Sequence, residues 1–291
     1  MLEKYAAFCY NQVGSYALEL VEYFEDLRPK LSKAGIEINL PEYISMMLFT
    51  VGIVGLMTLT VGGTFFVLSA GLPGVFIALI SSMVLTSLSA LGFYIYPSIL
   101  VRNRASKIKD TLPFATMYLA TLAGTGTPLP QIFKNLSETE EYGEVSREAA
   151  KISRDVETFG MDMSEALEKS ANRSPSEDYK ELMWGINHVI TTGGSLRQFL
   201  NQRAETLMNE YKRRVQEFSK NLSLLVEMYI TVVVVGSIIF TSMSAIMSTI
   251  SQNMSDNMIV GIQLLAIFFG LPLISGMFII LVRGMSPGGI R

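Results

Sequence analysis

Two long stretches without charged residues constrain the fold more than any other feature of this sequence. Residues 46–99 contain no Asp, Glu, Lys or Arg, and residues 221–282 contain only two. Each stretch is long enough for two membrane spans of about 20 residues. Because lipid cannot hydrogen-bond to an open backbone, such spans are expected to be helical. The sequence therefore predicts an all-α membrane protein.

Both uncharged stretches are interrupted near their middle by residues that favour turns. The first contains the sequence GLPG at 71–74, and the second contains SQNMSDN at 251–257. Glycine, proline and clusters of small polar residues mark turns between regular elements. The interruptions divide the two stretches into four predicted transmembrane helices, at about 46–69, 73–96, 224–248 and 258–282.

The distribution of basic residues predicts the orientation in the membrane. Of the 23 Lys and Arg residues, 17 lie between residues 100 and 222, and the two short turns between spans contain none. Basic residues are retained on the cytoplasmic side of a membrane. We therefore expect a multi-pass protein of the cytoplasmic membrane, with both termini, the 100–222 segment and the short tail 283–291 in the cytoplasm.

The N-terminal segment, residues 1–45, has apolar residues at helical spacing. They form one face of a predicted amphipathic helix over 1–34, ended by Gly35, and Pro41 is expected to start the next element. Two interpretations remain open: the helix packs on the protein or lies on the membrane, or it acts as a dimerisation arm. The apolar residues are Cys9, Val13, Tyr16, Ala17, Leu20, Phe24, Leu27 and Leu31.

A weak repeat organises residues 100–222. Gly126, Gly160 and Gly193 are each followed by apolar residues three and seven positions later. A glycine suits the left-handed end of one helix, and Pro128, Asp162 and Ser195 would suit the start of the next. The pattern predicts three helix–turn–helix units, a six-helix cytoplasmic bundle between spans two and three.

Several functional classes are disfavoured by what the sequence lacks. The formal net charge is −3, and residues 100–222 carry 17 basic and 17 acidic residues, which argues against a nucleic-acid partner. No phosphate-binding loop motif is present. The single histidine, His188, and the single cysteine, Cys9, predict neither a metal site nor a disulfide framework. The sequence therefore predicts no catalytic residues, no cofactor and no enzymatic activity.

Two residues of the second uncharged stretch are candidate functional positions. Glu227 lies about one turn inside span three, and an intramembrane carboxylate is a functional candidate by default. Two interpretations remain open. Glu227 couples to a partner, or its carboxylate reaches cytoplasmic water or pairs with Lys220. Asn253 begins an Asn-Met-Ser glycosylation sequon in the predicted outer turn.

The order of short motifs between the two membrane pairs resembles the type II secretion system F domain. The motifs are LPF at 112–114, LATLAG at 119–124 with GTPL at 126–129, FG at 159–160, and TGGSL at 192–196 with FL at 199–200. The resemblance covers roughly residues 29–282. The glycines of these motifs are Gly124, Gly126, Gly160, Gly193 and Gly194.

The resemblance implies a platform protein for a type IV-like pilus, an archaeal filament or a secretion pseudopilus. The single domain copy is similar to the short TadB/TadC type, which implies a second copy as a homodimer or a paralogous heterodimer. Further implied partners are a hexameric secretion or pilus ATPase, pilin-like subunits and membrane lipid. The alternative is a small membrane transporter or channel, which would need polar groups along its spans. A membrane receptor with dimerising helices would need a heptad seam continuing from the last span.

Overall fold

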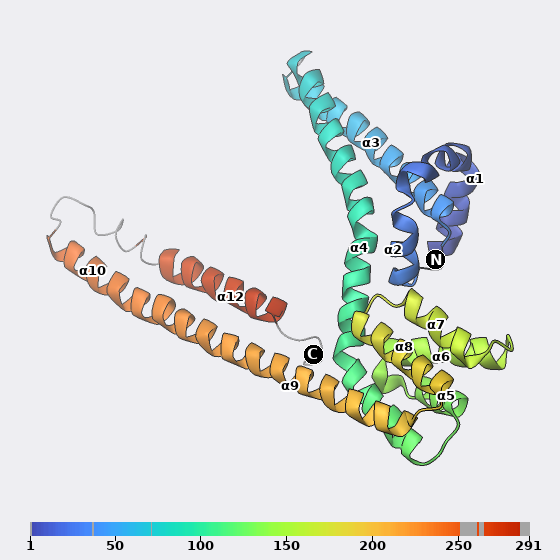
Figure 1. Cartoon of the computed structure of the whole chain (residues 1–291). Coiled ribbons are helices and arrows are strands. Elements are labelled where there is room, and N and C mark those ends of the chain that lie inside the picture. Colours follow the sequence, from blue (N-terminus) through green and yellow to red (C-terminus); the bar gives the residue numbers. More distant parts are fainter. Residues whose placement is uncertain (1, 37, 71, 251–260, 262–264, 286–291) are drawn as a thin grey trace. The chain divides into compact units, whose positions relative to one another are not determined.

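The computed structural model describes residues 2–36, 38–70, 72–250, 261 and 265–285. Within these residues every regular element is a helix, so the predicted all-α class is confirmed. The chain divides into two compact units, residues 1–200 and residues 201–291. Figure 1 labels the helices along the chain.

The N-terminal segment is divided into short helices instead of one long one. It forms α1 (Leu2–Leu20), the short 3-10 helix η1 (Val21–Phe24) and α2 (Leu27–Ala34). The predicted continuous helix over 1–34 is therefore wrong. Pro29 explains the break, because in a continuous helix its ring would clash with the carbonyl of Glu25. In the first turn of α2 its missing N–H has no consequence.

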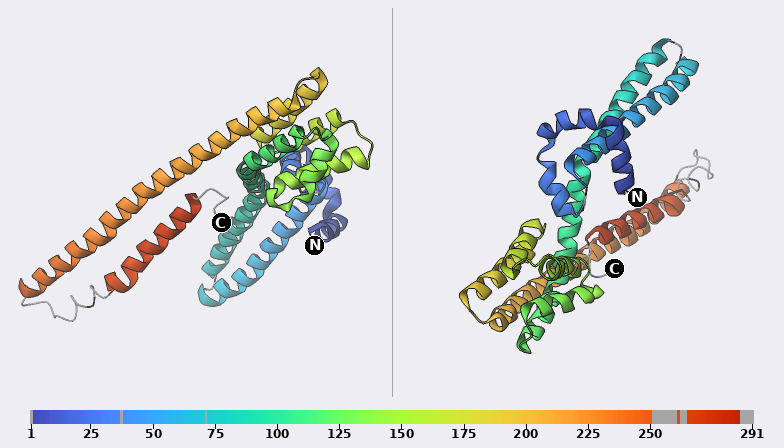
Figure 2. Two further views of the ribbon diagram at one scale, coloured as in Figure 1. Left: turned by 90° about the horizontal axis from the view of Figure 1, so that it is seen from below. Right: turned by 90° about the vertical axis from the view of Figure 1, so that its right-hand side faces the viewer.

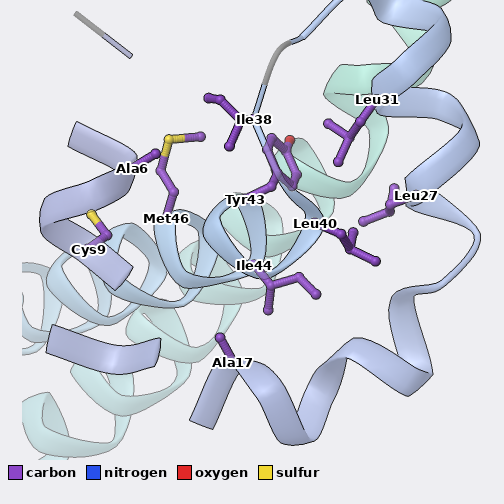
Figure 3. Packing of buried hydrophobic residues seen from close by; sticks show 10 residues of the cluster. All are labelled: Ala6, Cys9, Ala17, Leu27, Leu31, Ile38, Leu40, Tyr43, Ile44 and Met46. Carbon is purple, nitrogen blue, oxygen red and sulfur yellow. The ribbon is translucent and has the colours of Figure 1, made fainter. Parts of the chain in front are cut away.

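Because of this break, α1 and α2 pack around the start of α3 (Leu40–Ala70). The first residue of α3 is Leu40, one residue before the predicted start at Pro41. Their apolar side chains form one buried cluster, shown in Figure 3. Tyr16, which was expected on the buried face, is 68% exposed. The cluster contains Ala6, Cys9 and Ala17 of α1, Leu27 and Leu31 of α2, Ile38, and Leu40, Tyr43, Ile44 and Met46 of α3.

The helix α4 (Leu72–Gly124) is 53 residues long and pairs with α3 in its first half. Small and hydroxyl residues line the contact between them. The hydroxyls of Thr58 and Ser82 are 3.1 Å apart, and the Ser82 hydroxyl donates to the carbonyl oxygen of Gly55 at 3.4 Å. Close approach through small residues, joined by hydroxyl hydrogen bonds, is typical of helix packing in membranes.

The second half of α4 enters the bundle. It is followed by α5 (Leu129–Glu138), the 3-10 helix η2 (Glu140–Tyr142), α6 (Glu144–Glu157), α7 (Met163–Arg173), α8 (Glu177–Thr192) and α9 (Leu196–Tyr229). The chain therefore forms the three predicted helix–turn–helix pairs, α4–α5, α6–α7 and α8–α9. In the last pair the helices approach closely, because a Cβ added at Gly185 would lie 2.2 Å from the Phe199 ring.

The repeat glycines have the predicted backbone conformation. Gly126, Gly160 and Gly193 have φ values of 77°, 66° and 73°, in the left-handed region that favours glycine. The Asp162 carboxylate caps α7 by accepting from the Ser164 N–H at 2.9 Å. The Ser195 hydroxyl likewise accepts from the Gln198 N–H at 3.3 Å. The repeat thus encodes where helices end and begin.

In the second unit, α9 continues into an apolar helix. A π-helical segment η3 (Ile230–Val235) leads to α10 (Gly236–Ile250), and η4 (Ala266–Gly270), also π-helical, leads to α12 (Leu271–Met285). The Tyr229 hydroxyl lies 3.0 Å from that of Ser275, and its ring centroid lies 4.6 Å from that of Phe278. The end of α9 therefore packs against the middle of α12.

Three described helices are long and apolar enough to cross a membrane: Leu40–Thr64, Gly74–Gly124 and Leu196–Ile246. They overlap three of the four predicted spans. The fourth, at 258–282, lies partly outside the described residues, where a shorter apolar helix runs over Phe268–Gly284. The count of four spans stays a prediction.

Candidate functional site

The most unusual side chain of the bundle is a glutamate on a core-facing position. In α6, Val145, Ala149 and Ile152 recur at helical spacing and are buried. Glu148 lies on the same face, and none of its side chain is exposed. A buried carboxylate is costly unless it is paired and hydrogen-bonded. Its partners therefore define a site, which we call the Glu148 cluster.

Three cations surround the Glu148 carboxylate. Arg173 of α7 donates to Oε2 from Nε at 3.2 Å and from Nη2 at 3.0 Å. Lys151 approaches Oε1 at 3.2 Å, and Nη2 of Arg104 from α4 donates to the same oxygen. Both oxygens are thereby satisfied by charged donors, which make the stronger class of hydrogen bond.

Neutral hydroxyls extend the Glu148 cluster to α8. The Ser170 hydroxyl lies 3.5 Å from Glu148 Oε2 and 3.0 Å from the hydroxyl of Tyr179. Tyr179 is buried on α8. The cluster thus joins α4, α6 and α7 at one carboxylate and reaches α8 through the Ser170 hydroxyl.

Arg104 carries the connection beyond the bundle to the N-terminal helices. Its Nε donates to Glu144 Oε2 at 3.0 Å, and its Nη1 donates to the backbone oxygen of Lys33 at 3.0 Å. Lys33 is in the last turn of α2, where carbonyl groups lack helical partners. A single guanidinium therefore connects α2, α4 and α6.

Gly35 makes this contact possible in two ways. It ends α2 in the predicted left-handed conformation, with φ 76°, so the predicted helix end is confirmed. A Cβ added at Gly35 would lie 3.1 Å from Arg104 Nη1. Glycine therefore permits both the backbone conformation and the approach of the guanidinium.

The electrostatics fix the protonation states of the Glu148 cluster. Burial raises the pKa of Glu148, but the nearby Arg173, Lys151 and Arg104 outweigh it and hold the pKa below its ordinary value. Burial, followed by the Glu148 charge, raises the pKa of Tyr179 far above its ordinary value. Neither group titrates near neutral pH, so the arrangement suits a structural joint and not proton transfer.

The residues predicted as sites from the sequence lie elsewhere. None of the motif glycines belongs to the Glu148 cluster; Gly124 ends α4, where an added Cβ would lie 3.6 Å from Arg197 Nε, and the Gly194 N–H donates to the Val189 oxygen at 2.9 Å. Asn253 lies outside the described residues. Among the described residues no group of three His, Cys, Asp or Glu side chains is arranged to hold a metal.

Glu227 is exposed on α9, beside Ser223, Ile230 and Thr231. Its backbone oxygen accepts from the Thr231 hydroxyl at 2.9 Å. Within the part of the chain that the structure describes, its carboxylate forms no ion pair, and the expected alternative of pairing with Lys220 is not observed. Glu227 is thus available to water or to a partner.

The sequence analysis missed the Glu148 cluster, although one signal was present. Residues 145, 148, 149 and 152 share the i, i+3, i+4, i+7 spacing of a buried face, and 148 is the charged member. An acidic residue on such a face needs a cationic partner. The partners Arg104 and Arg173 are distant in the sequence, so no local pattern identifies them.

The fold and this site define a class: a helical membrane protein in which a helical bundle with buried ion pairs lies between apolar helices in the sequence. Residues 115–244 match the model of the type II secretion system protein F family. This part of the chain is therefore similar to that family, as its motifs indicated.

Relatives with assigned names come from archaea. Flagella accessory protein J of Methanocaldococcus jannaschii is 26% identical over 49% of this chain and 25% of its own length. Flagella accessory protein J of Methanococcus voltae is 25% identical over 47% of this chain and 25% of its own length.

An uncharacterised protein of Methanocaldococcus jannaschii is 26% identical over 66% of this chain and 33% of its own length. The matched region thus spans a quarter to a third of these relatives. No solved structure matches the chain.

Proposed function

We propose that this protein is a membrane platform subunit for assembly of a pilus-like filament, an archaeal flagellum or a secretion pseudopilus. The family match over residues 115–244 carries the proposal, and the relatives named flagella accessory proteins support it. In this role the protein holds other components in place and catalyses no reaction.

The long helices suit a mechanical role. The 53 residues of α4 correspond to about 80 Å at a rise of 1.5 Å per residue, from its pairing with α3 to the end of the bundle. The helix that starts at Leu196 likewise continues to Ile246 without a break in helical structure. A displacement applied to the bundle would be transmitted along α4, because its backbone stays helical from Leu72 to Gly124.

The Glu148 cluster would make the bundle respond as one body. Three helices meet at a carboxylate whose two oxygens are both occupied. The Ser170 hydroxyl links α8 to them, and Arg104 connects α2 to the same cluster. Losing the Glu148 carboxylate would remove the common counter-charge of Arg104, Lys151 and Arg173, and breaking a buried ion pair costs several kcal/mol. The cluster therefore resists separation of these helices when force is applied.

The partners follow from the proposed orientation. With residues 100–222 in the cytoplasm, the bundle would contact a hexameric ATPase, and the apolar helices would guide pilin-like subunits as they leave the bilayer. A second copy of the domain, identical or paralogous, would complete the platform. No contact among the described residues favours the alternative of a transporter or channel.

Deletion and rescue in the host test this function. A strain lacking the protein should show no filaments by electron microscopy, and the intact chain should restore them. An affinity-tagged chain solubilised from native membranes should retain the assembly ATPase, identified by mass spectrometry. Normal filaments in the deletion strain would refute the proposal. As a matched pair, Glu148→Gln should fail to rescue, whereas Glu177→Gln, which changes an exposed carboxylate of the same bundle, should rescue fully.

A further inference from the structure

The outer surface of α1 carries several aromatic side chains that are exposed in the described structure. Phe8, Tyr16 and Tyr23 of α1 and η1 are 54%, 68% and 82% exposed. Tyr5 and Tyr10 are more than one-third exposed as well. Single exposed apolar residues need no explanation, but several aromatic residues on adjoining short elements do.

Contacts with α3 fix the position of this surface relative to the first span. The ring centroid of Phe8 lies 5.8 Å from that of Phe49, and the Tyr5 hydroxyl lies 3.1 Å from that of Thr50. Phe49 and Thr50 belong to the apolar helix Leu40–Thr64, which is long enough to cross a membrane. The first half of α1 therefore lies beside the membrane-crossing part of α3 and not beside the bundle.

The other end of the same surface meets the end of span two. The ring of Phe24 lies 6.4 Å from that of Tyr94 on α4, and Lys30 Nζ lies 5.3 Å from the Tyr94 ring centroid. Tyr94 and Tyr96 are themselves exposed. Figure 2 shows α1, η1 and α2 forming an arc beside the α3–α4 pair. The aromatic residues thus gather where two apolar helices share one membrane boundary.

The chemistry of α1 suits the interfacial layer of a bilayer better than its hydrocarbon core. From residue 5 to residue 18 the chain has no charged residue, and the exposed aromatics alternate with uncharged polar residues such as Asn11, Gln12 and Ser15. Tyrosine is enriched at membrane interfaces because its ring is apolar and its hydroxyl is hydrated. Acidic residues follow at once, at Glu19, Glu22 and Glu25, which indicates where the chain returns to water.

From this placement we propose that α1 lies in the interfacial layer of the bilayer, with its exposed aromatic surface covered by lipid headgroups and the upper parts of acyl chains. The helix then forms part of an aromatic belt at the membrane interface, beside the start of span one and the end of span two. The uncharged surface implies insertion by apolar burial without attraction by anionic lipid. This inference concerns only membrane contact and is independent of the proposed motor and filament partners.

A tryptophan probe tests the proposal, because Trp184 is the only tryptophan of the chain. In a Trp184→Phe background, Tyr16→Trp places a probe on α1, and Phe159→Trp places a control probe in the α6–α7 turn. The two sites are matched, being 68% and 66% exposed. The full-length variants would be reconstituted in phosphatidylcholine vesicles, with and without lipids brominated near the headgroup end of the acyl chain.

We expect Tyr16→Trp to emit at shorter wavelength and to lose emission when brominated lipid is present. Phe159→Trp should instead lose emission to aqueous acrylamide and be insensitive to bromine. Acrylamide quenching of Tyr16→Trp equal to that of the control would overturn the proposal. Shielding of Tyr16→Trp from both quenchers would overturn it too, because a protein surface would then cover α1.

Discussion

Arg104 of α4 donates a hydrogen bond of 3.0 Å to the backbone oxygen of Lys33, 71 residues earlier in the chain. The same guanidinium holds Glu144 and Glu148 of α6. The first contact fastens the end of α2, and the others fasten the bundle, so one side chain connects the N-terminal helices to the bundle. The following predictions test this joint and the proposed membrane arrangement.

Removing the charge of Glu148 should strongly destabilise the protein. In Glu148→Gln, Arg173 loses this counter-charge and Arg104 keeps only Glu144, and breaking such a buried pair costs roughly 3–5 kcal/mol. Circular dichroism of the purified full-length variant in detergent should show a clearly lower Tm. Glu177→Gln is the control, because its exposed pair with Lys180 contributes at most about 1 kcal/mol. Equal Tm values for the two variants would contradict the role of the cluster.

The contribution of Glu148 should depend on pH in one direction. Its pKa in the folded protein is held below the ordinary value of 4.5. A lowered pKa stabilises the folded state above the unfolded-state pKa, and this stabilisation is lost as pH falls through the folded-state pKa. The difference in unfolding free energy between wild type and Glu148→Gln should therefore be constant above about pH 5.5 and shrink below pH 4.5. A difference that grows on acidification would contradict the assignment.

Gly35→Ala should be more destabilising than the same change at Gly126. Both glycines have nearly the same positive φ, 76° and 77°, so the backbone strain of about 1–2 kcal/mol is common to both. Only at Gly35 does the new Cβ approach Arg104, at 3.1 Å, whereas at Gly126 it meets open space. Thermal unfolding of both variants measures how much more stability Gly35→Ala loses than Gly126→Ala. Identical shifts in Tm would show that a Cβ at residue 35 does not disturb the contact with Arg104.

Glu227→Gln should reduce filament assembly without reducing the amount of protein in the membrane. The exposed carboxylate lies in the predicted third span and has no ion-pair partner among the described residues, so a partner subunit can pair with it. Filament counts by electron microscopy and membrane immunoblots measure the two effects. Glu217→Gln, ten residues earlier on the same helix, is the matched control. Unchanged filaments in Glu227→Gln would indicate that this carboxylate only contacts water.

Cysteine labelling should place the bundle in the cytoplasm. In a Cys9→Ala background, which removes the only native cysteine, Phe159→Cys presents an exposed thiol in the α6–α7 turn. A membrane-impermeant maleimide should label it only after the cells are opened. A cysteine at Asn253, in the predicted outer turn, should be labelled in intact cells. Labelling of Phe159→Cys in intact cells would refute the orientation and, with it, contact with a cytoplasmic ATPase.

Local sequence patterns were sufficient for features that depend on neighbouring residues. The absence of charge over 46–99 predicted the apolar helices of α3 and α4, because a charged side chain in lipid is costly. Gly126, Gly160 and Gly193 predicted the helix ends, because few other residues adopt a left-handed backbone. The motifs around these glycines were enough to indicate the family that the comparison over residues 115–244 supports.

Tertiary structure alone decided what depends on residues distant in the chain. The apolar spacing over 1–34 predicted one helix, but Pro29 and the common core with Tyr43 and Ile44 divide it into α1, η1 and α2. Glu148 became a site only when folding brought Arg104 and Arg173 to it from 44 and 25 residues away. A helical pattern specifies which face of a helix is buried, whereas the partner of that face is selected by packing across the whole unit.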